Sequence, residues 1–167
     1  MKVTIQESGL DFGEYEKSDV FLMEESLVYK SLPDNISTVE FVLRRKADEI
    51  LFVEAKRSSP NQEKLVDFEL FIDKICNKFA HSIDLFFSLV LKRLGDTHND
   101  MPNYFKTVDY SVPEMKLLLV LNDHPLESLS PISSALHKKL KRQIKTWRFG
   151  LTVMNHELAK EYGLLKQ

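Results

Sequence analysis

Hydrophobic residues recur at steps of three or four between residues 65 and 90, which predicts a long helix with one apolar face. The preceding segment, Ser59-Pro60-Asn61-Gln62, is typical of a helix start, with serine as the cap and proline at the first helical position. We expect the helix to end near Gly95, a residue suited to a left-handed cap. The apolar positions are Leu65, Phe68, Ile72, Ile75, Phe79, Ile83, Phe86 and Val90.

Short runs of β-branched and aromatic residues predict strands before this helix. Residues 39–43 and 50–55 are two such runs, and the polar segment 44–49 between them predicts a hairpin turn. Residues 3–6 predict a further short strand. The pattern of residues 20–32 fits a helix and a strand equally well, so the sequence leaves that choice open.

The chain continues after the long helix in the order strand, helix, strand, helix. Residues 96–113 are polar and irregular, and too long for a simple connection, so we expect a functional loop there. The later elements are expected at residues 115–121, from Ser130 to Gly150, at 151–154 and at 156–165.

This order of elements predicts an α/β fold in which helices flank a mixed central sheet. A chain of 167 residues can bury one hydrophobic core, so we expect a single domain over residues 1–167. The one cysteine, Cys76, excludes an internal disulfide and a cysteine-rich zinc site.

Charge and hydropathy narrow the class of protein. A net charge of -2 argues against a protein that coats nucleic acid by bulk electrostatics, but it allows one local basic face. The first residues lack the apolar stretch of a signal peptide, and no apolar run approaches the ~20 residues that span a bilayer. We therefore expect a cytoplasmic protein that does not enter a membrane.

The predicted hairpin carries the candidate chemistry. Alternate side chains of a strand share a face, so Glu54 and Lys56 project together. A turn centred on Ala47 places Glu40 opposite Glu54, with Cβ atoms roughly 5 Å apart, although a turn one residue longer or shorter would send Glu40 to the other face. Two carboxylates at this distance require a compensating cation. Mg²⁺ or Mn²⁺, which binds carboxylate oxygens, would satisfy them, and Lys56 would assist the metal-bound water.

An acidic residue on one strand, a hairpin, and an apolar strand ending in Glu54-Ala55-Lys56 resemble the PD-(D/E)xK nuclease superfamily. The resemblance extends over residues 20–154 and implies a restriction-endonuclease-like core. It also implies Mg²⁺-dependent hydrolysis of phosphodiester bonds in DNA or RNA. Glu40 and Glu54 would bind the metal ion and Lys56 would assist the nucleophile.

Many members of this superfamily also use a glutamate from the preceding helix, for which Glu25 is the first candidate in this chain and Glu24 the second. Two departures from the motif are visible: the first acid is usually aspartate, and no Pro-Asp pair precedes Glu40. They leave open a nuclease-like module that binds nucleic acid or protein without turnover. A third alternative is a homo-oligomeric assembly protein, for example a homodimer, in which Phe68, Phe79 and Phe86 of the long helix supply the interface.

The most basic stretch of the chain lies on the predicted helix near residue 140, opposite its apolar stripe. Such a face can contact phosphates of a nucleic acid, and the alternative is the ordinary solvated side of an amphipathic helix. The candidate nucleic-acid-binding residues are Lys138, Lys139, Lys141, Arg142 and Lys145.

Overall fold

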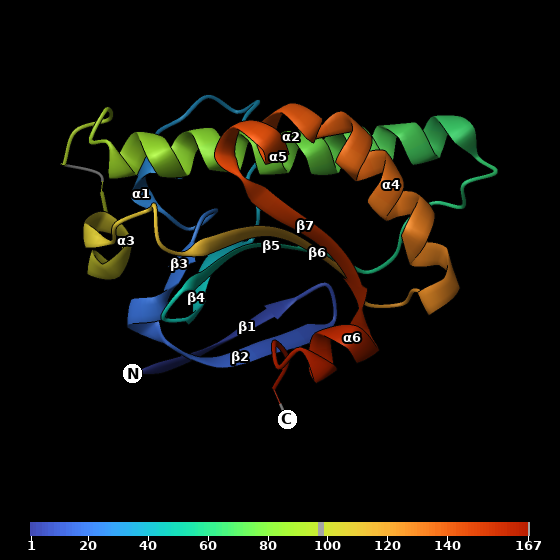
Figure 1. Ribbon diagram of the computed structural model, residues 1–167, viewed down its shortest axis with the longest axis horizontal. Coiled ribbons are helices and arrows are strands. Elements are labelled where there is room, and N and C mark those ends of the chain that lie inside the picture. The colour runs from blue at the N-terminus through green and yellow to red at the C-terminus, as the bar shows by residue number, and fades with distance from the viewer. Residues whose placement is uncertain (97–98, 167) are drawn as a thin grey trace.

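The computed structural model describes residues 1–96 and 99–166, which form three layers (Figure 1). The strands are β1 (Lys2–Glu7), β2 (Leu10–Glu16), β3 (Val20–Leu22), β4 (Phe41–Lys46), β5 (Glu49–Lys56), β6 (Glu114–Leu121) and β7 (Phe149–Asn155). The helices are α1 (Leu27–Lys30), α2 (Leu65–Val90), α3 (Asn103–Thr107), α4 (Leu129–Lys139), α5 (Lys141–Trp147) and α6 (His156–Glu161).

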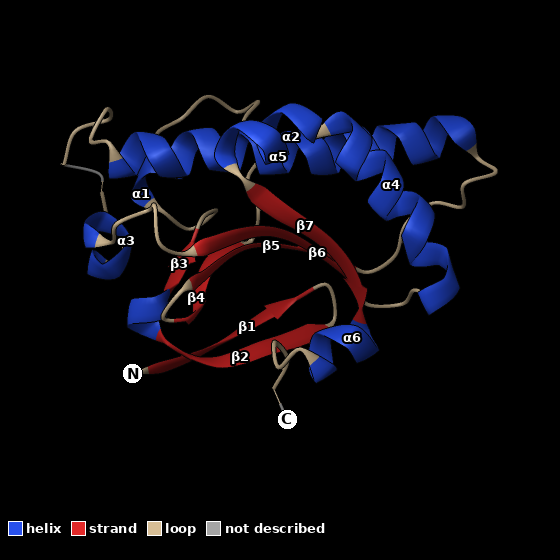
Figure 2. Cartoon of the chain, in the orientation of Figure 1, coloured by secondary structure: helices blue, strands red, loops and turns tan. Residues whose placement is uncertain are grey.

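A five-stranded mixed sheet forms the middle layer, in the order β3-β4-β5-β6-β7. Strands β3, β4 and β5 pair antiparallel, whereas β5, β6 and β7 pair parallel. Helices α2, α4 and α5 cover one face of this sheet, and the separate β1–β2 hairpin and α6 cover the other (Figure 2). The α/β class with a mixed central sheet and flanking helices is therefore confirmed.

The register of β4 against β5 agrees with the hairpin predicted around Ala47. Phe41 pairs with Val53, and Leu43 pairs with Leu51. A bulge between Arg44 and Lys46 shifts the pairing only next to the turn. The end of the hairpin that carries the acidic residues therefore keeps the predicted register.

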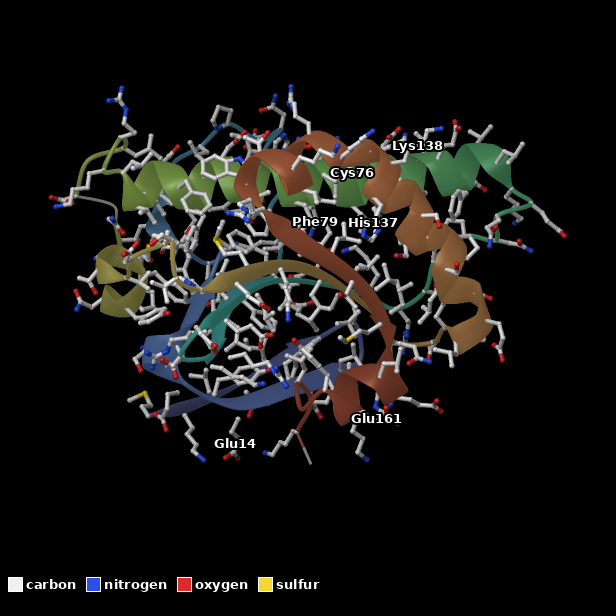
Figure 3. All side chains as sticks on the ribbon, viewed as in Figure 1. Glu14, Cys76, Phe79, His137, Lys138 and Glu161 are labelled. Carbon is white, nitrogen blue, oxygen red and sulfur yellow. The ribbon has the colours of Figure 1, made fainter. Side chains whose placement is uncertain are left out.

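Each face of the central sheet has its own hydrophobic cluster. Toward α2, Phe52 packs edge-to-face on Phe86, with ring centroids 5.1 Å apart. Toward the β1–β2 hairpin, Phe12 packs on Phe41 at 5.3 Å. Figure 3 shows Phe79 between α2 and the sheet, and both Phe79 and Phe86 are fully buried. Neither is therefore available for the dimer interface considered above.

Helix α2 begins at Leu65 rather than at Pro60, because local hydrogen bonds of Asn61 compete with the helix. The side chain of Asn61 accepts a hydrogen bond from the backbone N–H of Glu63 at 3.1 Å, and its carbonyl accepts one from Lys64 at 3.0 Å. The helix ends at Val90 because Lys92, with φ of 56°, is already left-handed, so Gly95 lies beyond the end of the helix.

The basic helix expected from Ser130 to Gly150 is divided into α4 and α5 at Leu140. Arg148 ends α5 in a left-handed conformation, with φ of 57°, and Gly150 lies within β7. The segment 20–32 forms both alternatives in turn, first β3 and then α1.

The remaining boundaries differ by smaller amounts. The polar segment 96–113 contains α3, and its residues 97–98 lie outside the described part of the chain. The C-terminal helix stops at Glu161 instead of residue 165. Among the helices in the described residues, none combines the length and the apolar character needed to cross a membrane.

The first residue of β5 belongs to a buried ionic network. The Lys116 Nζ and the Tyr162 hydroxyl each donate to Oε1 of Glu49 at 2.7 Å, and Arg45 Nη1 donates to Oε2 at 2.7 Å. Burial alone would raise the pKa of Glu49, but these three hydrogen bonds outweigh it and lower the pKa to about 2. Because Arg45 also donates to the backbone oxygen of Tyr162 at 2.6 Å, the network fastens the residue after α6 to the sheet.

Replacing Glu49 should destabilise the fold at neutral pH. We expect Glu49→Gln to lower the free energy of unfolding by about 2 kcal/mol, because Arg45 loses its anion and Lys116 keeps only the exposed Glu114. The lowered pKa means that the carboxylate stabilises the fold above its ordinary pKa of 4.5, and that this contribution disappears as the pH falls toward about 2. Urea unfolding at pH 7 and at pH 3 measures both effects.

Glu114→Gln is the matched control, because Glu114 contacts the same Lys116 at 3.4 Å but its side chain is 77% exposed. An exposed pair contributes little, so this variant should lose less than about 0.5 kcal/mol. Equal losses in the two variants at pH 7 would contradict the assignment of the network to Glu49.

Candidate functional site

Glu54 and Lys56 lie at the carboxyl end of β5, on the face of the sheet that α2 covers. Ile50 and Phe52 on the same face pack in the cluster beneath α2, whereas Val53 and Ala55 pack in the opposite cluster. The Glu54 side chain is fully buried. Lys56 Nζ lies 2.6 Å from its Oε1, so the Glu-x-Lys pair is joined within one strand.

Glu40 lies directly before β4 and faces the same point. Its backbone N–H donates to the carbonyl of Val53 at 3.1 Å, which continues the ladder between β4 and β5 by one residue. Its Oε1 is 3.9 Å from Lys56 Nζ. The structure therefore brings Glu40, Glu54 and Lys56 together, as the predicted hairpin register requires.

Lys78 of α2 joins this group, and sequence reasoning did not identify it. Its Nζ is 3.1 Å from Oε1 of Glu54 and 3.6 Å from Oε1 of Glu40. Lys78 lies three residues after Ile75 and four before Ser82, both buried, so it falls on the buried side of the helix. A lysine on the buried side of a helix indicates that a buried anion lies opposite it, and this pattern could have identified Lys78 from the sequence.

Glu24 supplies a third carboxylate. Its Oε1 is 3.2 Å from Lys78 Nζ, and the backbone N–H of the preceding residue, Met23, donates to the carbonyl of Glu40 at 3.2 Å. We call these five residues, Glu24, Glu40, Glu54, Lys56 and Lys78, the acidic cluster.

Glu25, the first candidate for the auxiliary acid, lies elsewhere. It lines a separate cavity of about 210 Å³ together with Lys17, Phe21 and Asp100. Glu24 therefore occupies the place in the cluster that was expected first for Glu25. The order of the two candidates was reversed because the ambiguous segment 20–32 gave no reliable side-chain direction.

Ser82 holds α2 in register with the segment that leads to Glu40. Its Oγ donates to the carbonyl of Lys78 at 2.7 Å and accepts the backbone N–H of Val39 at 2.8 Å. One buried hydroxyl thus links the backbone at Lys78 to the residue before Glu40. The relative position of the lysine and the carboxylates is set by this link and by the β4–β5 ladder.

Burial dominates the electrostatics of the acidic cluster, and the charge of Glu54 adds to its effect on Glu40. Burial, and then the charge of Glu54, raise the pKa of Glu40 to about 7, although Lys78 opposes them. Burial also raises the pKa of Glu54 against the lowering effect of Lys78 and Lys56. Burial would lower the pKa of Lys78, but the neighbouring carboxylates outweigh it and raise that pKa. The pKa of Glu40 therefore lies near neutral pH.

The acidic cluster has the donor chemistry of a divalent-metal site, but a lysine stands within it. Carboxylate oxygens are the ligands that Mg²⁺ prefers, and Oε2 of the buried Glu54 has no hydrogen-bond partner among the described residues. No group of three His, Cys, Asp or Glu side chains in this part of the chain is arranged to hold a metal ion. Glu40 and Glu54 thus have the donor chemistry for a metal ion, but with Lys78 between them the described residues do not form a metal site.

The candidate nucleic-acid-binding residues lie on the other side of α2. All five are exposed, and Lys139 Nζ forms an ion pair with Asp73 of α2. Asp73 and Lys78 are five residues apart, which places them about 140° apart around the helix. Figure 3 shows Lys138 on the outer side of α4. Lys139 therefore contacts α2 on a side turned away from Lys78.

Comparisons with protein-family models, with curated proteins and with solved structures gave no significant match. The functional interpretation therefore depends on the residues of the acidic cluster and on their geometry.

The raised pKa of Glu40 predicts a stability difference that depends on pH. A carboxyl whose pKa rises on folding stabilises the fold below its ordinary pKa of 4.5, and this contribution is lost as the pH rises through about 7. Between pH 5 and pH 8 the unsubstituted protein should lose about 2 kcal/mol that Glu40→Gln does not lose. Urea unfolding of both proteins across this range measures the difference.

Glu54→Gln tests whether the charge of Glu54 contributes to the raised pKa of Glu40. Removing the neighbouring charge should lower the pKa of Glu40 without returning it to 4.5, because the burial of Glu40 remains. Carbon-13 NMR titration of the Glu40 carboxyl measures this directly. A midpoint near 4.5 in the unsubstituted protein would show that burial and the charge of Glu54 do not govern the pKa of Glu40.

Proposed function

We propose that the protein is a Mg²⁺-dependent nuclease that hydrolyses phosphodiester bonds of DNA or RNA. The observation that carries the proposal is the convergence of Glu40, Glu54 and Lys56 on one point of the sheet, with Glu24 beside them. This arrangement supplies carboxylates for a metal ion and an ammonium group for a phosphate within one small region.

The order of the elements supports the same proposal. Three antiparallel strands, β3, β4 and β5, are followed by the long helix α2 and then by the parallel strand β6. The resemblance to PD-(D/E)xK nucleases implies this succession around its motif. The acidic cluster also lies at the carboxyl end of β5, and ligands of α/β proteins commonly bind at that edge of a sheet.

The residues of the acidic cluster have separable roles in hydrolysis. Glu40 and Glu54 would hold Mg²⁺ or Mn²⁺, and a bound ion supplies a more acidic water and charge neutralisation at the phosphate. Lys56, whose side chain is 35% exposed, can donate a hydrogen bond to the attacking water or to a phosphate oxygen. The Glu24 side chain is 42% exposed to solvent, and Glu24 would be the auxiliary acid. The water oxygen bonds to phosphorus and loses a proton to solvent, the bond from phosphorus to the leaving oxygen breaks, and the leaving oxygen takes up a proton from solvent.

We also propose that the basic face of α4 and α5 contacts the phosphate backbone away from the point of cleavage. Lys138, Lys141, Arg142 and Lys145 are exposed, and each neutralised phosphate adds salt-dependent affinity. Because Lys139 pairs with Asp73 on a side of α2 turned away from Lys78, these contacts would hold the nucleic acid without touching the scissile phosphate.

A second candidate function is a nuclease-like binding or interaction module without turnover. One observation favours it: Lys78 places an ammonium group among all three carboxylates, and this group already balances part of their charge. In such a module the Lys78 ammonium group would stay among the carboxylates, and the protein would bind nucleic acid or protein without a metal ion.

Cleavage assays with Mg²⁺ or Mn²⁺ on single- and double-stranded DNA and RNA test the first function. We expect Glu54→Gln and Lys56→Met each to reduce cleavage at least about a hundredfold, because each removes a group aimed at the reacting phosphate. Glu63→Gln and Lys74→Met are the matched controls, since both change exposed residues outside the acidic cluster. Cleavage that persists in both cluster variants would contradict the proposal.

A comparison of Glu24→Gln with Glu25→Gln tests which acid is auxiliary, and the larger loss should follow Glu24→Gln. Calorimetric titration with Mg²⁺ separates the two candidate functions. Absence of cleavage, together with no binding at millimolar Mg²⁺, would favour the module without turnover.

A further inference from the structure

We propose that Lys78 and a divalent metal ion exclude one another in the acidic cluster, so that Lys78 is an internal competitor that must withdraw when metal binds. This inference concerns the regulation of the nuclease site and rests on the proposed function. It assigns a role to a residue outside the Glu-x-Lys motif.

The position of the ammonium group is the first observation. Glu24, Glu40 and Glu54 come from the segment before α1, the segment before β4 and the end of β5, yet all three approach Lys78 Nζ. The separations are 3.2, 3.6 and 3.1 Å. A metal ion that binds the same carboxylates needs the same space, and a second cation there would be strongly repelled.

The second observation is the incomplete pairing of Glu54. This carboxylate is fully buried, and its Oε2 lacks a hydrogen-bond partner within residues 1–96 and 99–166. An unpaired oxygen at a buried carboxylate is costly, because burial removes it from water. The lysines therefore stabilise Glu54 incompletely, and an acceptor remains free for another ligand.

The charge balance favours a divalent ion in exchange for Lys78. With both lysines in place, the three ionised carboxylates of the acidic cluster leave one negative charge uncompensated. When Lys78 withdraws, two negative charges remain, and one divalent ion neutralises them. Lys56 stays in place in this exchange, because it contacts Glu54 at 2.6 Å from within the same strand.

The structure gives Lys78 a direction in which to move. Its side chain is 16% exposed, and its partner Glu24 is 42% exposed, so the solvent side of the cluster lies toward Glu24. The backbone at Lys78 is held by Ser82 Oγ, which donates to its carbonyl at 2.7 Å. The unbranched lysine side chain can therefore move while α2 stays docked.

Calorimetric titration with MgCl₂ tests the competition. We expect Lys78→Met to bind Mg²⁺ at least about tenfold more tightly than the unsubstituted protein, because it removes one cation from the site. Lys78→Arg keeps the charge and should not bind more tightly. Lys74→Met, which removes an exposed lysine one turn away, should leave the affinity unchanged.

An affinity in Lys78→Met equal to or weaker than that of the unsubstituted protein would overturn the inference while leaving the proposed metal site intact. Failure of every variant to bind Mg²⁺ would overturn both. Tighter binding in Lys78→Met without cleavage of any nucleic acid would support the competition and contradict only the nuclease.

A second measurement covers the case in which Lys78→Met does not fold. Nitrogen-15 NMR of the lysine ammonium groups of the unsubstituted protein, assigned with Lys78→Arg, reports on the contacts of Lys78 directly. Addition of Mg²⁺ should increase the solvent exchange of the Lys78 ammonium protons. An unchanged Lys78 signal at saturating Mg²⁺ would overturn the inference.

Discussion

The fully buried carboxylate of Glu54 can be tolerated beneath α2 only because two ammonium groups contact it, and the rest of the acidic cluster follows from this requirement. Lys56 contacts the Glu54 carboxylate from the same strand, and Lys78 contacts it from α2. Glu40 and Glu24 then share the ammonium group of Lys78. The buried charge of Glu54 thus adds a polar contact to the apolar stripe of α2, which packs on the sheet through residues such as Ile75 and Phe79.

The two ends of β5 show how differently a buried glutamate can be accommodated. Glu49 receives three hydrogen bonds from Lys116, Arg45 and Tyr162, and its pKa falls to about 2. At the other end, burial raises the pKa of Glu54 against Lys78 and Lys56, and burial together with the charge of Glu54 raises the pKa of Glu40 against Lys78. Glu49 is thus completely paired, as a structural network requires, whereas Oε2 of Glu54 has no hydrogen-bond partner among the described residues.

The sequence predicted the fold class, the hairpin and the convergence of Glu40, Glu54 and Lys56, because the period of two along a strand and the short turn together fix the register. Lys78 and Glu24 could not be placed in the same way, since their contacts arise only when segments distant in sequence meet. The start of α2 was wrong for a local reason: the hydrogen bonds of Asn61 compete with the first turn of a helix.

The link from Ser82 to Val39 has a consequence for the order in which the chain can fold. A β4–β5 hairpin that forms before α2 docks places Glu40 beside Glu54 while Lys78 is absent, and like charges on facing strand positions oppose pairing. Docking of α2 brings Lys78 and the Ser82 hydroxyl to the hairpin together, since both lie on one face of the helix. The same charges that form the site therefore couple the folding of a local hairpin to that of a distant helix, and so make the folding transition more cooperative.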